Sequence, residues 1–196
     1  MIRRLLTAAA VISLAACEAP TPAESVPVPT PAEQPSASAP GANVLTAQGF
    51  GPLRIGMTRA EVEAALGPDS DPKSVGGPDP ASCDMFRPAR APEGLSVMLE
   101  NGVLTSVWVS RNAAVETERD LNVGDTAAEV RRVHGSAAVV EPHKYVEAPA
   151  EYLTVWSTAD HSSAAARGLK YEIGLDGKVQ TIAAGGPSIS YVEGCL

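Results

Sequence analysis

The sequence predicts an α+β protein made of two tandem modules, each a short helix packed on a three- to four-stranded antiparallel sheet. Two observations support this fold class. A fifteen-residue stretch occurs twice, as LRIGMTRAEVEAALG at 53–67 and as LNVGDTAAEVRRVHG at 121–135, with seven identical positions. Each copy is followed by strand-like segments and by one tight-turn pair, Asn-Gly at 101–102 and Asp-Gly at 176–177. Self-similarity of this kind indicates that one structural unit has been duplicated.

Each copy carries the sequence signature of a helix start. Thr58 precedes Glu61 by three residues, and Thr126 precedes Glu129 in the same way, which is the spacing of a capping box. A glycine closes each copy at the place where a helix of about two turns would end. The alternative is that Glu61 and Glu129 form a pair of catalytic carboxylates, although the capping spacing already accounts for both.

Residues 1–16 have the organisation of a secretory signal, with two arginines near the start and an apolar stretch too short to span a bilayer. The Leu-Ala-Ala-Cys sequence at 14–17 resembles the bacterial lipobox. This resemblance implies that Cys17 is lipidated, and several acyl chains would anchor it stably in a membrane. An ordinary signal peptide with an incidental cysteine is the alternative. The residue after the cysteine is Glu18, and by resemblance to sorted lipoproteins this favours the outer membrane, with the folded part facing the periplasm.

Residues 17–43 combine the lipidated cysteine with a linker. Seven of the seventeen prolines lie there, among Ala, Ser, Thr and Glu and without any Lys or Arg. A segment of this composition favours extended polyproline II and acts as a tether. The folded part then divides into a first module at 44–117 and a second at 118–196. The formal charge of −8 makes nucleic acid an unsuitable partner.

Runs of β-branched and apolar residues place the strands. The sequence predicts strands at 83–87, 95–100 and 103–110 in the first module, and at 152–156, 169–173, 178–183 and 188–192 in the second.

The repeated motif, G-[MD]-T-x-x-E-V-x(4)-G followed by a β-meander, resembles the repeat of the SmpA/OmlA (BamE-like) outer-membrane lipoproteins. A tandem pair of such units resembles the architecture of the β-lactamase inhibitor protein, in which a sheet grips another protein. A group of proteobacterial outer-membrane lipoproteins is also similar, through Cys83, the Pro-His-Lys-Tyr at 142–145 and the Tyr-Val-Glu-Gly-Cys at 191–195. These resemblances imply a lipid-anchored module that binds another envelope protein, in assembly or as an inhibitor.

Cys83 and Cys195 are the two cysteines besides Cys17. An even number of cysteines in an exported domain favours a disulfide between them. Two free thiols or a metal site are the alternatives.

No chemical signature stands out among the remaining residues. His134, His143 and His161 lack metal-type spacing with one another or with a carboxylate, and no nucleophile elbow, P-loop or His-Glu-x-x-His motif occurs. We therefore expect no enzymatic activity, no cofactor and no metal. Trp108 and Trp156 lie on predicted strands, either as core residues or as anchors of a protein interface.

Three classes of function stay open from the sequence. A protein-binding lipoprotein of the envelope is the expected one. A periplasmic module that binds a small molecule or glycan would require a concave pocket with converging polar groups. A hydrolase would require a strongly perturbed His or carboxylate in a cleft.

Overall fold

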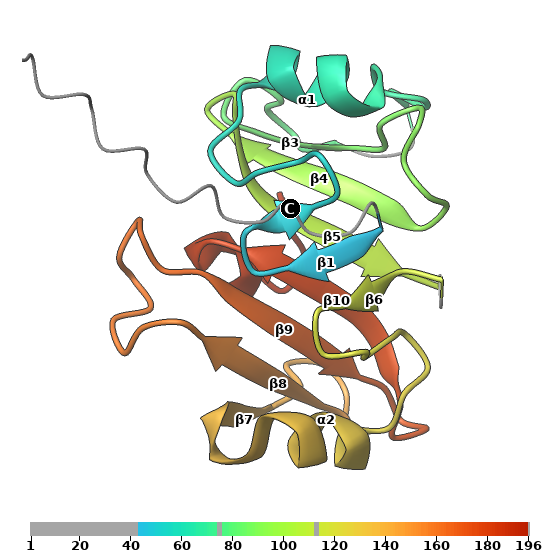
Figure 1. The fold of residues 1–196 in the computed structure, drawn as a ribbon, viewed down its shortest axis with the longest axis vertical. Coiled ribbons are helices and arrows are strands. Elements are labelled where there is room, and N and C mark those ends of the chain that lie inside the picture. Colours follow the sequence, from blue (N-terminus) through green and yellow to red (C-terminus); the bar gives the residue numbers. More distant parts are fainter. Residues whose placement is uncertain (1–42, 74–75, 112–113, 196) are drawn as a thin grey trace, which may run out of the picture. The chain divides into compact units, whose positions relative to one another are not determined.

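A computed structural model of the chain describes residues 43–73, 76–111 and 114–195, which belong to one compact unit. The predicted signal, Cys17 and most of the predicted linker lie outside the described residues. Two sheets and two α-helices make up the described part (Figure 1). None of its helices has the length and apolar character needed to cross a membrane.

The larger sheet has seven antiparallel strands in the order β3-β4-β5-β10-β9-β8-β7. Their bounds are β3 (Cys83–Phe86), β4 (Leu95–Glu100), β5 (Val103–Ser110), β7 (Ala138–Pro142), β8 (Glu151–Trp156), β9 (Gly168–Ile173) and β10 (Val179–Gly185). The prediction of an α+β fold is confirmed, but the prediction of two equal tandem modules is wrong. Strands β5 and β10 pair side by side, so the three strands that follow the first copy of the motif and the four that follow the second form one continuous sheet.

Both helices start as the sequence predicts. Helix α1 (Arg59–Leu66) begins at Thr58, whose N–H donates to the Glu61 carboxylate at 2.8 Å, and helix α2 (Ala127–His134) begins with the same 2.8 Å bond between Thr126 and Glu129. In return, each threonine hydroxyl accepts from the backbone N–H of its glutamate. Bonds from the Thr58 N–H and hydroxyl hold the pKa of Glu61 below its usual value, and Thr126 does the same for Glu129. Both glutamates are therefore engaged as helix caps.

Each helix start is also fastened to the tight turn of its own hairpin. The Arg59 N–H donates to the Gly102 carbonyl at 3.0 Å, and the Ala127 N–H donates to the Gly177 carbonyl at 3.0 Å. An isolated β-bridge lies beside each of these bonds. The duplicated unit is therefore larger than the capped helix, since it includes the way the helix docks on the hairpin turn.

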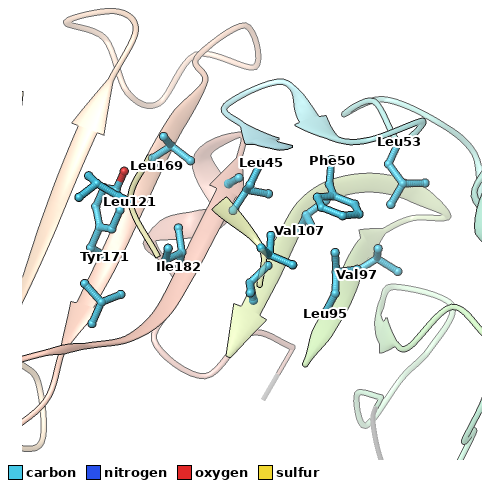
Figure 2. Packing of buried hydrophobic residues seen from close by; sticks show 14 of the residues in the cluster. Leu45, Phe50, Leu53, Leu95, Val97, Val107, Leu121, Leu169, Tyr171 and Ile182 are labelled. Carbon is cyan, nitrogen blue, oxygen red and sulfur yellow. The ribbon is translucent and has the colours of Figure 1, made fainter. Parts of the chain in front are cut away.

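A second, three-stranded sheet was not predicted. It consists of β1 (Val44–Thr46), β2 (Gly49–Phe50) and β6 (Glu116–Thr117) in the order β2-β1-β6, with β1 antiparallel to β2 and parallel to β6. It lies over the middle of the large sheet, between α1 and α2 (Figure 1). Its residues Leu45 and Phe50 point toward Val107 on β5, and the whole set is buried (Figure 2).

The large sheet therefore has two differently covered faces. We call the first the helix face, because Val62 of α1, Val130 of α2 and the small sheet pack on it in the main core. We call the other the tail face, because the C-terminal residues 186–195 pack on it through Ile189 and Cys195. This tail contains a 3₁₀ helix, η2 (Pro187–Ser190), where a strand at 188–192 was predicted. The strand prediction was wrong because the tail crosses a face of the sheet, where no backbone edge is available for pairing. A second 3₁₀ helix, η1 (Gly135–Ala137), directly follows α2.

The capping boxes give a first prediction. Replacing Thr58 or Thr126 with Ala should lower the free energy of unfolding by about 0.5–2 kcal/mol, because an N–H at the helix start loses its acceptor. Replacement with Ser should change it little. Urea unfolding of the four variants measures this, and the two positions should respond alike because their hydrogen bonds are equivalent. Unchanged stability in both alanine variants would contradict the assigned caps.

Candidate functional site

Cys83 of β3 and Cys195 of the tail form a disulfide, with a Cα–Cα distance of 5.5 Å. This confirms the predicted pairing and sets aside free thiols or a metal site at these positions. The bond fastens the end of the chain to the edge strand of the sheet across a sequence separation of 112 residues. Disulfides of this kind are typical of proteins in oxidising compartments outside the cytoplasm.

The two tryptophans occupy different places on the tail face. Trp108 is only 8% exposed, because the tail residues Ile189 and Cys195 pack with it, and its indole N–H donates to the Ser106 hydroxyl at 2.8 Å. Trp108 is therefore a core residue in this structure and presents no surface to a partner. Trp156 is half-buried, and its ring stacks on His161 with a centroid distance of 5.0 Å. It stays a candidate for an interface.

The Trp156 ring can occupy its position because residue 168 is a glycine and has no side chain there. A Cβ at Gly168 would lie 2.7 Å from the Trp156 ring and 3.0 Å from Ile189. The ring thus lies directly over the backbone of the neighbouring strand, and the tail packs beside it.

Lys170 on β9 is the charged residue that the sequence did not single out. It is only 5% exposed, and its ammonium group donates to the Tyr191 carbonyl of the tail at 2.7 Å. The same group lies over the rings of Trp108 and Tyr152, at 5.3 and 5.0 Å from their centroids. The approach to Trp108 depends on Ala183, since the register of the sheet places this small side chain between the two residues.

Further polar groups surround this lysine. The Tyr152 ring stacks on His143 with a centroid distance of 4.7 Å, and the His143 Nε2 lies 3.2 Å from the Glu172 carboxylate. We call Lys170, Tyr152, His143 and Glu172 the Lys170 cluster. Burial lowers the pKa of Lys170 to about 8, and the nearby carboxylates of Glu172 and Glu141 oppose this shift.

A lysine with a lowered pKa is a common feature of catalytic sites, where the neutral amine acts as a base or nucleophile. Here the ammonium is covered by two rings and by the tail, and its bond goes to a backbone carbonyl. The arrangement therefore serves to hold the tail on the sheet. Lys170 and Glu172 alternate with apolar residues along the strand Gly168–Ile173, which is the pattern of a half-exposed strand, so no local signal marked Lys170 as buried.

The three histidines lie in separate environments. His143 belongs to the Lys170 cluster and His161 stacks on Trp156, whereas His134 at the end of α2 lies 3.0 Å from the Tyr171 hydroxyl in the main core. Burial, with the charge of Arg119, lowers the pKa of His134. Across the described ranges, no group of three His, Cys, Asp or Glu side chains is placed to hold a metal ion.

The two outer edges of the large sheet differ. At β3, a Cβ on Gly77 would lie 2.5 Å from the Cys83 carbonyl, so the backbone at Gly77 covers that edge. At the opposite edge, β7 pairs with β8 and with no other strand of the described residues. The His143 N–H continues this ladder with a bond of 3.4 Å to the Ala150 carbonyl.

This bond fixes which backbone groups of β7 face outward. Because antiparallel pairs alternate between bonded and non-bonded positions, Ala138, Val140 and Pro142 direct their backbone away from β8. Pro142 stands where its missing N–H removes no ladder bond. The Ala138 N–H already donates to the Gly135 carbonyl of the preceding 3₁₀ turn, so the outward N–H group left on this edge is that of Val140.

Apolar side chains accompany this open edge. Val139 is 46% exposed and Val140 is 50% exposed, and the register places them on opposite faces of the sheet. A groove of about 920 Å³ runs beside Val140, between α2 and the loop at 143–150. Tyr145 is exposed in this loop and lines the groove. An ion pair between Arg131 of α2 and Glu151 of β8 lies at its floor.

Lys170 gives a prediction about pH. Its pKa is lower in the folded chain than the ordinary value near 10.5, so between about pH 8 and pH 10 the unfolded state binds more protons. The free energy of unfolding should therefore rise with pH across this window. The rise should be smaller in Lys170→Met and unchanged in Lys144→Met, which alters an exposed lysine. Chemical unfolding at pH 7.5, 8.5 and 9.5 measures the slopes, and equal slopes in wild type and Lys170→Met would contradict the burial of a charged amine.

Comparisons with known proteins give little guidance. No family model matches the chain, and no curated protein matches it either. Among solved structures, it is similar to an extracellular protein containing a SCP domain from Bacillus anthracis str. Ames, with a TM-score of 0.41 and 8% sequence identity. The match covers 67% of this chain and 44% of that protein, which is less than half of its length. A likeness this distant supports no statement about function.

Proposed function

We propose that this protein is a lipid-anchored envelope protein that binds an extended segment of another envelope protein along the outer edge of β7. The observation that carries the proposal is the outer edge of β7, with which no other strand of the described ranges pairs, and the half-exposed valines on both faces beside it. An added strand would pair with the outward backbone groups of Val140, as in other cases of β-strand addition.

The contrast between the two edges supports this proposal. Proteins usually protect an edge strand with a lysine, a bulge or a covering segment, because an open edge invites pairing with other chains. The edge of β3 has such a cover at Gly77. β7 has regular pairing, no lysine and two adjacent valines. Pro142 limits the edge at one end, and the bond from the Ala138 N–H to the Gly135 carbonyl limits it at the other. An edge left open in this way suits a specific partner.

The groove beside β7 adds a place for side chains. Successive residues of an added strand point to opposite faces, so every second one would enter the groove next to Val140 and Tyr145. The lining there combines apolar residues with the paired charges of Arg131 and Glu151. We therefore expect a segment with small or apolar residues at alternate positions.

Two features support the proposed location, one inside the folded part and one before it. The disulfide fits an oxidising compartment, and the Leu-Ala-Ala-Cys sequence at 14–17 resembles a lipobox. We propose that Cys17 carries the lipid anchor in the outer membrane and that the proline-rich linker holds the folded part in the periplasm. The resemblance of the repeated motif to the SmpA/OmlA lipoproteins agrees with a binding role, without enzymatic activity or a cofactor.

The edge proposal is tested by Val140→Pro, which removes an outward N–H but no ladder bond. Photo-crosslinking from position 138 in cells should capture a partner in the wild type, and Val140→Pro should weaken binding of that partner at least about tenfold. Hydrogen exchange at the Val140 N–H should slow when the purified partner is added. The free energy of unfolding should stay within about 1 kcal/mol of wild type, because Pro at an edge position is tolerated.

The neighbouring position is the matched control. Val139→Pro removes a ladder N–H and should destabilise the protein clearly, which checks the register. Two results would reject the proposal. One is a partner that binds Val140→Pro normally but is lost in Trp156→Ala, which would place the interface on the tail face. The other is a crosslink only to a second copy of this chain.

Lipid anchoring is tested separately at Cys17. Cells fed a clickable palmitate should label the wild-type protein, and Cys17→Ala should abolish the label because the thiol that accepts the lipid is gone. Fractionation should at the same time move the protein out of the membrane. A wild-type protein that carries no label would show that the cysteine is incidental.

A further inference from the structure

A second concave site lies where residues from both halves of the chain meet at the start of the tail. It is a cleft of about 380 Å³ and is bounded by the β4–β5 hairpin, the loop at 162–167 and the tail at 186–191. We call it the seam cleft. It shares no lining residue with the groove beside β7, so a ligand here would be independent of the proposed partner of β7.

The cleft has an apolar floor and one charge of each sign. Ile55, Val103 and Leu104 supply the floor, and Val103 is among the large apolar residues that stay exposed. Glu100 and Arg167 also line it. A cavity of this size with a few convergent polar groups has the properties of a small-molecule site.

Arg167 is held in a fixed orientation. Its Nη1 donates to the carbonyls of Ala164 and Ala166 at 2.9 and 2.7 Å. In the described part of the chain, both of these bonds leave from the same nitrogen, so the remaining N–H groups of the guanidinium are available to a ligand. A planar guanidinium fixed in this way is suited to a carboxylate.

Glu100 is held from the other side of the cleft. Its Oε1 accepts from the Tyr191 hydroxyl at 3.0 Å, and this bond raises the pKa of Tyr191. A carboxylate has further acceptor capacity, so the same group can also take a bond from a ligand ammonium.

The wall formed by the tail is fastened at several points. Lys170 binds the Tyr191 carbonyl, the Gly186 N–H donates to the Thr105 carbonyl at 2.9 Å, and the disulfide holds the chain end. Thr105 itself sits in a β-bulge of β5, where the register shifts opposite Met98 and Leu99. Bulges recur next to binding sites because they turn side chains out of the regular sheet pattern.

One buried group in the cleft has no partner. The Ser188 hydroxyl is buried and makes no hydrogen bond to the described residues, although Ser188 lines the cleft. Buried hydroxyls are normally paired, and an ordered water is the usual partner where the protein offers none.

From these observations we infer that the seam cleft binds a small zwitterion of the amino-acid type. Its carboxylate would lie on Arg167, its ammonium on Glu100, and its apolar side chain on Val103 and the neighbouring floor. Neither a purely anionic nor a purely cationic molecule would satisfy both charges.

The test uses leucine as the probe, with leucinamide and N-acetylleucine as derivatives that each lack one charge. Isothermal titration of the full lipidated chain in detergent should show leucine binding at least about tenfold tighter than either derivative, because each derivative leaves one charged group unpaired. Glu100→Gln keeps an acceptor for Tyr191 but should remove the preference for leucine over N-acetylleucine. Arg167→Lys should weaken the binding of leucine, because a lysine ammonium lacks the planar pair of N–H donors that fits a carboxylate.

A matched pair of filling variants separates the site from folding. Val103 and Leu175 are exposed aliphatic residues next to the two equivalent hairpin turns. Val103→Trp should abolish leucine binding by occupying the cleft, whereas Leu175→Trp should leave it unchanged. Absence of saturable leucine binding to the wild type, equal binding of all three probes, or normal binding to Val103→Trp would each overturn the inference.

Discussion

The pairing of β5 with β10 is the constraint on which the rest of the structure depends. Each repeat ends in a strand that would otherwise be an exposed edge, and a helix on three or four strands buries little core by itself. Joining the two edges removes both and creates one sheet on which a common core can form. The small residues Ala183, Ala184 and Gly185 of β10 lie opposite the larger ones of β5 at this seam.

These small residues also decide how the two faces are covered. On the helix face, Ala184 lies in the core with Leu45, so the three-stranded sheet can approach the seam closely. On the tail face, Ala183 leaves room for Trp108 and the Lys170 ammonium to meet. Lys170 then binds the tail, and the disulfide fixes its end. Both faces of the sheet are thus occupied by parts of the same chain.

The sequence predicted the features that depend on neighbouring residues. The capped helices, the two tight turns and most strands of the large sheet have local signals, and the disulfide follows from the number of cysteines. β1, β2 and β6 were missed because two or three residues are too short to show a period. β7 was missed because both of its faces are half-exposed and Pro142 ends it, which hides the alternation of a strand. Lys170 resembled a solvent-facing residue, since the tail that buries it lies about twenty positions away in the sequence.

Because both faces of the large sheet are covered, its edges and the cleft beside the tail are the places where a partner could bind. Comparison of the two repeats shows where they differ. After α1, the described residues before β3 form no regular strand, and the backbone lies against β3 at Gly77. After α2, the equivalent part of the chain forms β7, and no strand within the described part of the chain pairs with its outer edge. The helix docking that precedes these segments is the same in both repeats, so the fold itself does not require the difference. A segment that varies on a constant scaffold is where function is most often carried, because the scaffold already supplies stability. The open edge of β7 arises where the two repeats stop being alike, and the seam cleft arises where the tail and the loop at 162–167 meet the first repeat.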